Sequence, residues 1–218
     1  QEVYSVFGIS GYWFRLSLPD FEKKDKYGGD KKKWEKASQS IREAMAEFDI
    51  DYKEEKGEAA FYGPKIDVQI KNAQGKEETL GTAQVDIVVP EKLGLVYVDK
   101  DDKKKNVVVI HRAILGSYER FIAYLLEQTK GNLPLWLVPV QIRVLSFTER
   151  NVEAAKKVYV SLRDAGLRTE MDERNLSVDA KVREGELMKT PYILVIGDKE
   201  EKSGSIAVRK RGERKIEF

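Results

Sequence analysis

The chain has 218 residues, of which 41% are hydrophobic and 35% are charged, and its Lys+Arg and Asp+Glu counts of 39 and 37 leave a net charge of +2. This balance gives no general nucleic-acid-binding signature, so any contact with RNA has to come from local patches. The lack of cysteine excludes disulfides and thiolate metal sites within these residues. Because no signal peptide or bilayer-spanning apolar run is found, we expect a cytoplasmic protein, with no membrane partner, of one or two domains.

A strand and a helix are the first predicted elements. Apolar and polar side chains alternate between residues 12 and 18, which predicts a half-buried strand. After a charged loop, Asp30 is placed to cap a helix over residues 31–48. One face of this helix is apolar and the other carries lysines and glutamates, which predicts packing on one side only. The apolar positions are Trp34, Ala37, Ile41, Ala44, Met45 and Phe48.

The middle of the chain has the pattern of β-strands. Apolar residues alternate over residues 66–70 and 85–89, with turn residues at 72–75 between them. Residues 95–98 predict a further strand, and the β-branched run at residues 107–110 predicts a buried strand. Hairpins followed by one long helix indicate an α+β domain with an antiparallel sheet.

A strand-to-helix junction follows, and it contains the only histidine. Apolar residues recur there at three- and four-residue steps, which predicts an amphipathic helix with Ile114, Tyr118, Phe121, Ile122 and Leu125 on one face. Small residues and an arginine at the start of a helix allow an anionic ligand to approach closely. A satisfied core histidine and a surface arginine are an equally good interpretation of the same residues, which are His111, Arg112, Gly116, Ser117 and Arg120.

The second half of the chain has a different order of predicted elements. Two prolines and a glycine without periodicity at residues 131–139 predict a domain boundary, which we place between residues 136 and 137. Strands and helices then alternate, which indicates βαβ crossovers and a mostly parallel or mixed sheet. The predicted elements are strands at 141–147, 167–171 and 192–196, helices at 152–165 and 178–188, and a final hairpin that pairs 206–209 with 215–218.

Three segments, in order along the chain, resemble threonyl-tRNA synthetases. They are GEAAFYGPKID at 57–67, GTAQVDIVVPEKLGLVYVD at 81–99 and HRAILGSYERF at 111–121, and the third resembles motif 3 of the class II aminoacyl-tRNA synthetases. The resemblance continues through PLWLVPVQIRVL to the end of the chain. It implies a partial class II catalytic domain over residues 1–136, with an antiparallel α+β sheet. An α/β anticodon-binding domain with a mixed five-stranded sheet would follow over residues 137–218.

The activity implied by this resemblance is threonine–tRNA ligase, which activates threonine with ATP and Mg²⁺ and transfers it to tRNA(Thr). Attack of a carboxylate on the α-phosphate needs positioning and cations rather than a protein nucleophile. Without the resemblance, Lys65 is a solvated turn residue and the polar strand face is solvent-exposed. Thr79 departs from the family, since bacterial members commonly have glutamine there. The implied substrate-binding residues are Tyr62, Lys65, Thr82, Gln84, Ser117 and Arg120, with Lys65 and Arg120 as the catalytic ones.

His111 matches the last of three zinc ligands in the family, where zinc holds the amino and hydroxyl groups of threonine and so rejects valine. The other two ligands, a cysteine and a histidine, have no counterpart here. Motif 1, which builds the homodimer interface, and motif 2 are not matched either. We therefore expect a fragment or one half of a split protein that binds zinc weakly or not at all and charges no tRNA by itself.

In the second domain, the resemblance assigns anticodon reading to Asn175, Arg183, Glu200 and Arg209, which we expect to converge at one edge of the sheet. A basic cluster at residues 209–215 suits phosphates. Without the resemblance, this cluster is a solvated hairpin. The alternative function is that of a non-catalytic, truncated synthetase relative that binds RNA or a protein partner.

Overall fold

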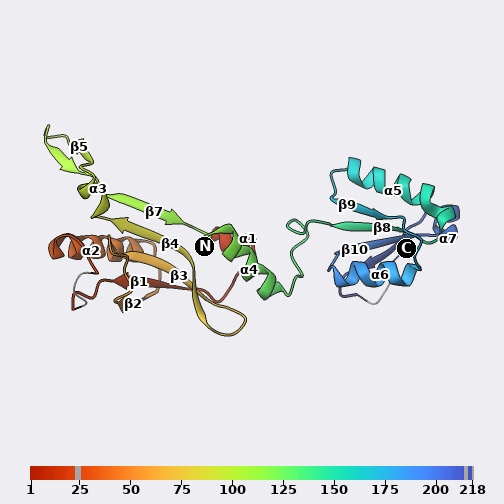
Figure 1. Cartoon of the computed structure of the whole chain (residues 1–218), viewed down its shortest axis with the longest axis horizontal. Helices are drawn as coiled ribbons and strands as arrows, with labels where there is room; N and C mark the ends of the chain where they lie inside the picture. Colours follow the sequence, from red (N-terminus) through yellow and green to blue (C-terminus); the bar gives the residue numbers. More distant parts are fainter. Residues whose placement is uncertain (23–25, 214–215, 218) are drawn as a thin grey trace. The chain divides into compact units, whose positions relative to one another are not determined.

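The structure is a computed structural model that describes residues 1–22, 26–213 and 216–217. It contains two compact units, Gln1–Gln128 and Thr129–Phe218, which are described separately below (Figure 1). Residues 129–136 are grouped with the second unit, where the guanidinium of Arg168 donates to the carbonyls of Leu135 and Trp136. The domain bounds expected from the sequence, 1–136 and 137–218, stay a prediction. No helix among the described residues combines the length and the apolar character needed to cross a bilayer.

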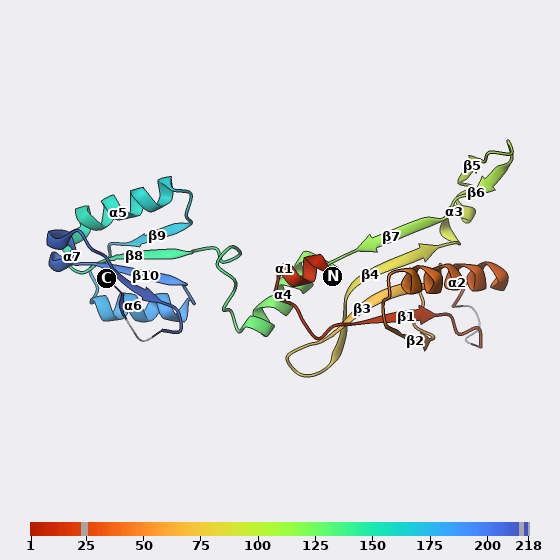
Figure 2. The ribbon, with the colours of Figure 1, turned by 180° about the vertical axis from the view of Figure 1, so that it is seen from behind.

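The first unit is a five-stranded sheet with one helix across one face (Figure 2). The strand order is β2 (Tyr52–Lys56), β1 (Trp13–Leu18), β3 (Lys65–Lys71), β4 (Glu77–Asp86) and β7 (Val109–Ala113). Four strands pair in antiparallel fashion, as expected, but β2 pairs with β1 in parallel. Helix α2 (Lys31–Glu47) makes the crossover that a parallel pair requires.

Helix α2 supplies the apolar cover of this sheet. The side chain of Asp30 accepts from the backbone N–H of Lys32 at 3.1 Å, which confirms the predicted cap. Ile41 and Met45 pack against Leu16 and other apolar residues of the strands. The expectation that Ala44 and Phe48 face the core is wrong, because both are exposed. The helix ends at Glu47, and Phe48 follows it with 71% of its surface exposed.

Short elements surround the sheet. Helix α1 (Glu2–Val6) lies beside α4 (Tyr118–Thr129), and the rings of Phe7 and Phe121 meet edge to face at 4.7 Å (Figures 1 and 2). The strand expected over residues 85–89 ends at Asp86. The Oδ1 atom of Asp86 accepts from the backbone N–H groups of Val88 and Val89, and helix α3 (Val89–Lys92) begins there. Between the strands expected at 95–98 and 107–110, the charged residues include β6 (Lys104–Asn106), which pairs with β5 (Val96–Val98) in a separate hairpin.

The junction at residues 107–118 differs from its predicted burial. Strand β7 lies at the edge of the sheet, and Val108 and Ile110 are 55% and 69% exposed, so the expectation of a buried strand is wrong. On α4, Phe121 is buried as predicted, whereas Tyr118 and Ile122 are exposed. The β-branched run therefore indicates a strand but not its depth in the protein.

The second unit is a mixed five-stranded sheet between helices, as predicted. Strand β8 (Ile142–Ser146) pairs in parallel with β9 (Thr169–Asp172) and β10 (Tyr192–Ile196). Strands β11 (Ala207–Lys210) and β12 (Ile216–Glu217) add an antiparallel edge. Helices α5 (Val152–Asp164) and α6 (Val178–Leu187) cover opposite faces (Figure 1). The short helices η1 (Glu149–Asn151) and α7 (Asp198–Ser203) follow β8 and β10.

The two faces of this sheet carry separate cores. Val144, Ala155 and Leu194 belong to a cluster that includes α5, and Leu145 and Val182 belong to a cluster that includes α6. The predicted final hairpin is present in β11 and β12, although residues 214, 215 and 218 of that prediction lie outside the described residues.

Candidate functional site

The sheet of the first unit has one apolar face, which packs on α2, and one polar face. Directly opposite residues on neighbouring strands point to the same side of a sheet. The register pairs Ser17 with Lys65, Lys65 with Gln84, and Gln84 with His111. A second row contains Arg15, Asp67 and Thr82, and Gln69 pairs with Thr79 beyond it. We call these side chains the polar face: Arg15, Ser17, Lys65, Asp67, Gln69, Thr79, Thr82, Gln84 and His111.

Asp67 organises the centre of the polar face. Its side chain is fully buried, and its Oδ2 accepts from the Ser17 hydroxyl at 2.8 Å and from the Arg15 guanidinium at 3.3 Å. The ammonium of Lys65 also donates to this oxygen. One buried carboxylate therefore pairs with two cations, of which Arg15 also contacts Glu55 at 3.2 Å, and it holds Lys65 in place.

Tyr62 lies over the polar face from the loop before β3. Its hydroxyl donates to Oε1 of Gln84, and its ring centroid is 5.5 Å from that of His111. Burial, with a smaller contribution from the charge of Asp86, raises the pKa of Tyr62, so its hydroxyl stays protonated at neutral pH. The loop approaches β4 closely at Gly63, where an added Cβ would lie 1.6 Å from the carbonyl oxygen of Val85. Glycine is thus required for Tyr62 to reach Gln84.

His111 is held by a carboxylate that the sequence analysis did not assign to the site. Its Nε2 is 2.9 Å from Oδ2 of Asp86, which is 2% exposed. The other oxygen of Asp86 is engaged by the amides that start α3. The sequence did contain a signal for Asp86, because it shares a strand face with Gln84 two residues earlier.

The described residues do not form a zinc site. No group of three potential metal-ligating side chains is found among them. His111 is one imidazole, and the nearby carboxylate of Asp86 is already engaged. That His111 is one of the zinc ligands implied by the resemblance stays a prediction, and no chemical step is assigned to zinc.

Ser117 and Arg120 lie at one end of the polar face, at the start of α4. The guanidinium of Arg120 donates to the carbonyl oxygen of Thr79 at 3.2 Å, and its backbone N–H donates to the Ser117 hydroxyl at 3.4 Å. Arg112 pairs with Ala83 and therefore points to the opposite side of the sheet. The structure thus brings the predicted substrate-binding residues onto or beside one sheet face.

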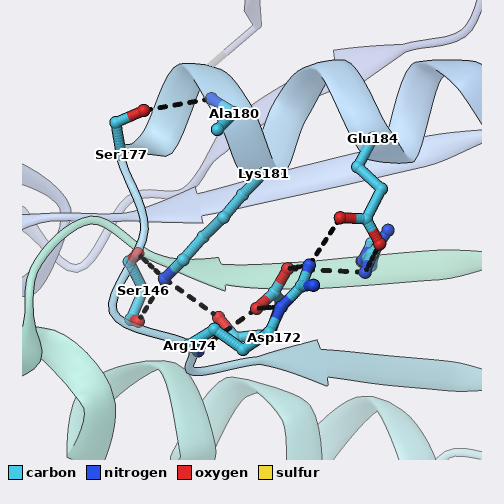
Figure 3. A network of polar contacts seen from close by, with 8 residues as sticks. Ser146, Asp172, Arg174, Ser177, Ala180, Lys181 and Glu184 are labelled. Atoms are coloured by element: carbon cyan, nitrogen blue, oxygen red, sulfur yellow. Dashed lines mark hydrogen bonds and ion pairs between the residues drawn. The ribbon is translucent and has the colours of Figure 1, made fainter.

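In the second unit, a polar network with a buried centre at Ser146, Asp172 and Lys181 connects the ends of the parallel strands (Figure 3). The guanidinium of Arg174 forms two hydrogen bonds with Asp172, at 2.9 and 2.6 Å, and it also binds Glu184 at 2.7 Å. Lys181 is 2% exposed, and its ammonium donates to both oxygens of Ser146 and to the carbonyl of Asp172. Burial lowers the pKa of Lys181. This network ties β8, β9 and α6 together.

Three of the four predicted anticodon residues line two hollows at this end of the sheet. Asn175 lines a hollow of about 510 Å³, and Glu200 and Arg209 line another of about 430 Å³. Arg183 is exposed on α6 and lines neither of them. Glu200 is on α7, and its carboxylate accepts from the backbone N–H of Gly197 at 3.0 Å.

Some basic residues of the hairpin cluster bind other groups of the protein. The guanidinium of Arg211 donates to the carbonyls of Lys189 and Leu133, and Lys210 pairs with Glu213. Residues 214 and 215 lie outside the described residues. Within the described part of the hairpin, Arg209 is the basic residue that faces a hollow.

We expect Asp67→Asn to lower the free energy of unfolding of the first unit by about 3–5 kcal/mol, because Arg15 and Lys65 lose their buried counter-charge. Urea unfolding followed through the NMR signal of the buried Trp34 indole measures this. Asp101→Asn is the matched control, since Asp101 pairs with lysines at the surface. Equal stability of Asp67→Asn and wild type contradicts the role assigned to Asp67.

Asp172 generates a prediction about pH. The hydrogen bonds from Arg174 hold the pKa of Asp172 below its ordinary value of 3.8. The unfolded chain therefore takes up this proton first, and stability is lost as pH falls from that value through the folded-state pKa. We expect Asp172→Asn to be less stable than wild type at pH 7, with the difference shrinking below about pH 4. Urea unfolding followed through NMR signals of the second unit measures this, and a difference independent of pH contradicts it.

Comparison with known proteins agrees with this architecture. The family described as "tRNA synthetase class II core domain (G, H, P, S and T)" matches residues 1–129, and the family "Anticodon binding domain" matches residues 137–217. Threonine–tRNA ligase 1 of Bacillus subtilis (strain 168) is 48% identical over 100% of this chain and 34% of that protein. Threonine–tRNA ligase of Halalkalibacterium halodurans is 47% identical over 98% of this chain and 33% of that protein.

A solved structure of the RNA binding domain of threonyl-tRNA synthetase from Cryptosporidium parvum Iowa II is also similar. It has a TM-score of 0.84 and 34% identity, over 99% of this chain and 54% of that one. The chain spans about a third of the length of the curated relatives, in their C-terminal part. With a class II core domain over residues 1–129 and an anticodon-binding domain after it, the chain belongs to the class II aminoacyl-tRNA synthetase family.

Proposed function

We propose that the chain is part of a threonine–tRNA ligase, in which the polar face contributes to the threonine and ATP site and the second unit reads the anticodon of tRNA(Thr). The observation that carries the proposal is the row of Lys65, Gln84 and His111 across three neighbouring strands, with Tyr62 above it. The curated relatives named above, which are threonine–tRNA ligases, support the same proposal.

The proposed chemistry begins with attack of the threonine carboxylate on the α-phosphate of ATP, and pyrophosphate leaves. Negative charge develops on the phosphoryl oxygens, so fixed cations and donors near them lower the barrier. Lys65, held by Asp67, and Arg120, at the start of α4, supply such charges. A guanidinium also has a flat face for stacking and a fork for phosphate oxygens. Mg²⁺ enters with ATP as part of the substrate.

Polar groups on the same face are suited to orienting the amino acid. Tyr62 and Gln84 already form a hydrogen-bonded pair, and Gln84 also contacts the Thr82 hydroxyl at 3.4 Å. Hydroxyl and amide groups of this kind hold a small polar ligand with defined geometry. His111 contributes one imidazole to any metal held jointly with other residues of a complete enzyme. The homodimer and the cytoplasmic location belong to the same proposal.

The test is filter binding of the chain to tRNA(Thr) with its anticodon intact or changed. We expect the intact anticodon to bind more tightly. Arg209→Gln is expected to remove about 1–3 kcal/mol of that preference, or roughly 5- to 150-fold, because a base-reading contact is lost. Arg163→Gln is the matched control, since Arg163 is exposed on α5 and pairs with the adjacent Asp164. Equal affinity for both anticodons contradicts the function proposed for the second unit.

We expect the purified chain to retain no tightly bound zinc after dialysis against a chelator, because one histidine cannot hold the ion. Metal analysis by mass spectrometry, before and after zinc is added back, measures this. His111→Ala is the control for binding through this imidazole. One zinc retained per wild-type molecule, and lost in His111→Ala, contradicts this expectation.

A further inference from the structure

Phe147 is a half-exposed aromatic residue at the end of the parallel strands of the second unit. It follows β8 directly, and its backbone N–H donates to the carbonyl of Ile196 at 2.9 Å, which fixes it to the end of β10. Its side chain is 51% exposed. Gly197 packs behind it, since a Cβ added there would lie 3.3 Å from Cβ of Phe147. The ring is therefore supported by backbone and accessible to solvent.

The same ring lines both hollows around the predicted anticodon residues. The larger hollow has Asn175, Arg174 and Ser177 on its other walls, and the smaller one has Glu200, Arg209 and several valines. Among the described residues, Phe147, Thr148 and Arg150 line both. Of the other exposed apolar side chains in the unit, Leu176 lines the larger hollow alone, and Leu187 and Met188 line neither. What singles out Phe147 is an exposed aromatic ring on a wall shared by two hollows.

The groups around this ring are suited to unpaired RNA bases. Among the described residues, the side chains of Asn175 and Arg209 form no hydrogen bond, so each has donors free for a base edge. Arg150 lines both hollows, and its side chain is 79% exposed and 3.7 Å from Asp198, where it can also meet a phosphate. Stacking on an aromatic ring combined with reading of base edges is the usual way in which proteins recognise single-stranded RNA.

We infer that Phe147 is a base-stacking residue, against which an anticodon base of the bound tRNA packs while Asn175 or Arg209 reads the edge of a base in the adjoining hollow. This inference rests on the proposed function, since it names a further residue of the same RNA site. It also explains why a large apolar side chain is left half exposed at this edge of the sheet.

The experiment uses the whole chain and the anticodon stem-loop of tRNA(Thr), with 2-aminopurine placed at one anticodon position at a time. Stacking on Phe147 changes the fluorescence of at least one of these positions on binding. Phe147→Leu keeps an apolar side chain but removes the π face, so we expect it to abolish that change and weaken binding about 10-fold or more. Phe147→Tyr is expected to restore both.

Trp136→Leu is the matched control, because Trp136 is 49% exposed and lines neither hollow. We expect it to bind the stem-loop as wild type does. If Phe147→Leu binds with wild-type affinity and fluorescence while a changed anticodon still weakens binding, the stacking role is overturned and the proposed function stands. Binding by wild type that ignores the anticodon overturns both.

Discussion

The buried carboxylate of Asp67 is the interaction on which the polar face depends. An unpaired charge at this depth carries a large desolvation cost, so the fold has to bring donors to it. Arg15 and Ser17 come from β1. Lys65 comes from β3, the strand of Asp67 itself, two residues earlier. The strand register places Lys65 opposite Gln84 and Gln84 opposite His111, and the side chain of Gln84 is held by Tyr62 and Thr82. Apolar contacts with α2 stabilise the opposite face, so the two sides of the sheet are held by different kinds of interaction.

Elements with a regular apolar pattern could be predicted from the sequence. Helix α2 has the period that packing on one side imposes, strand β3 has alternating apolar residues, and the second unit has apolar strand and helix segments in alternation. Strand β2 could not, because YKEEK has no apolar alternation and its place in the sheet depends on the crossover through α2. For residues 107–110 the strand could be predicted but its exposure could not. β-Branched residues favour extended backbone at an edge as well as in a core, so their exposure depends on which strands are neighbours.

The candidate site could be predicted only in part. Tyr62 and Lys65 were assigned through resemblance, since their local pattern is equally that of a turn. Asp86 was visible beside Gln84 on one strand face, but its contact with His111 depends on the pairing of β4 with β7. Phe147 had the appearance of the last residue of a strand. Its ring is half exposed between two hollows because three separate chain segments meet there. A local sequence pattern does not contain that information.

Lys181 has a consequence for how this domain tolerates sequence change. Its ammonium has three protons, and each is directed at an oxygen at the ends of β8 and β9. A compact tetrahedral group fits that arrangement, whereas a planar guanidinium is larger and presents its donors in a fork. Lysine-to-arginine exchange is among the mildest substitutions on a protein surface, but at Lys181 it changes the shape of the cationic group. Relatives that keep the fold therefore have to keep the ammonium, or rearrange the ends of β8 and β9 around another group.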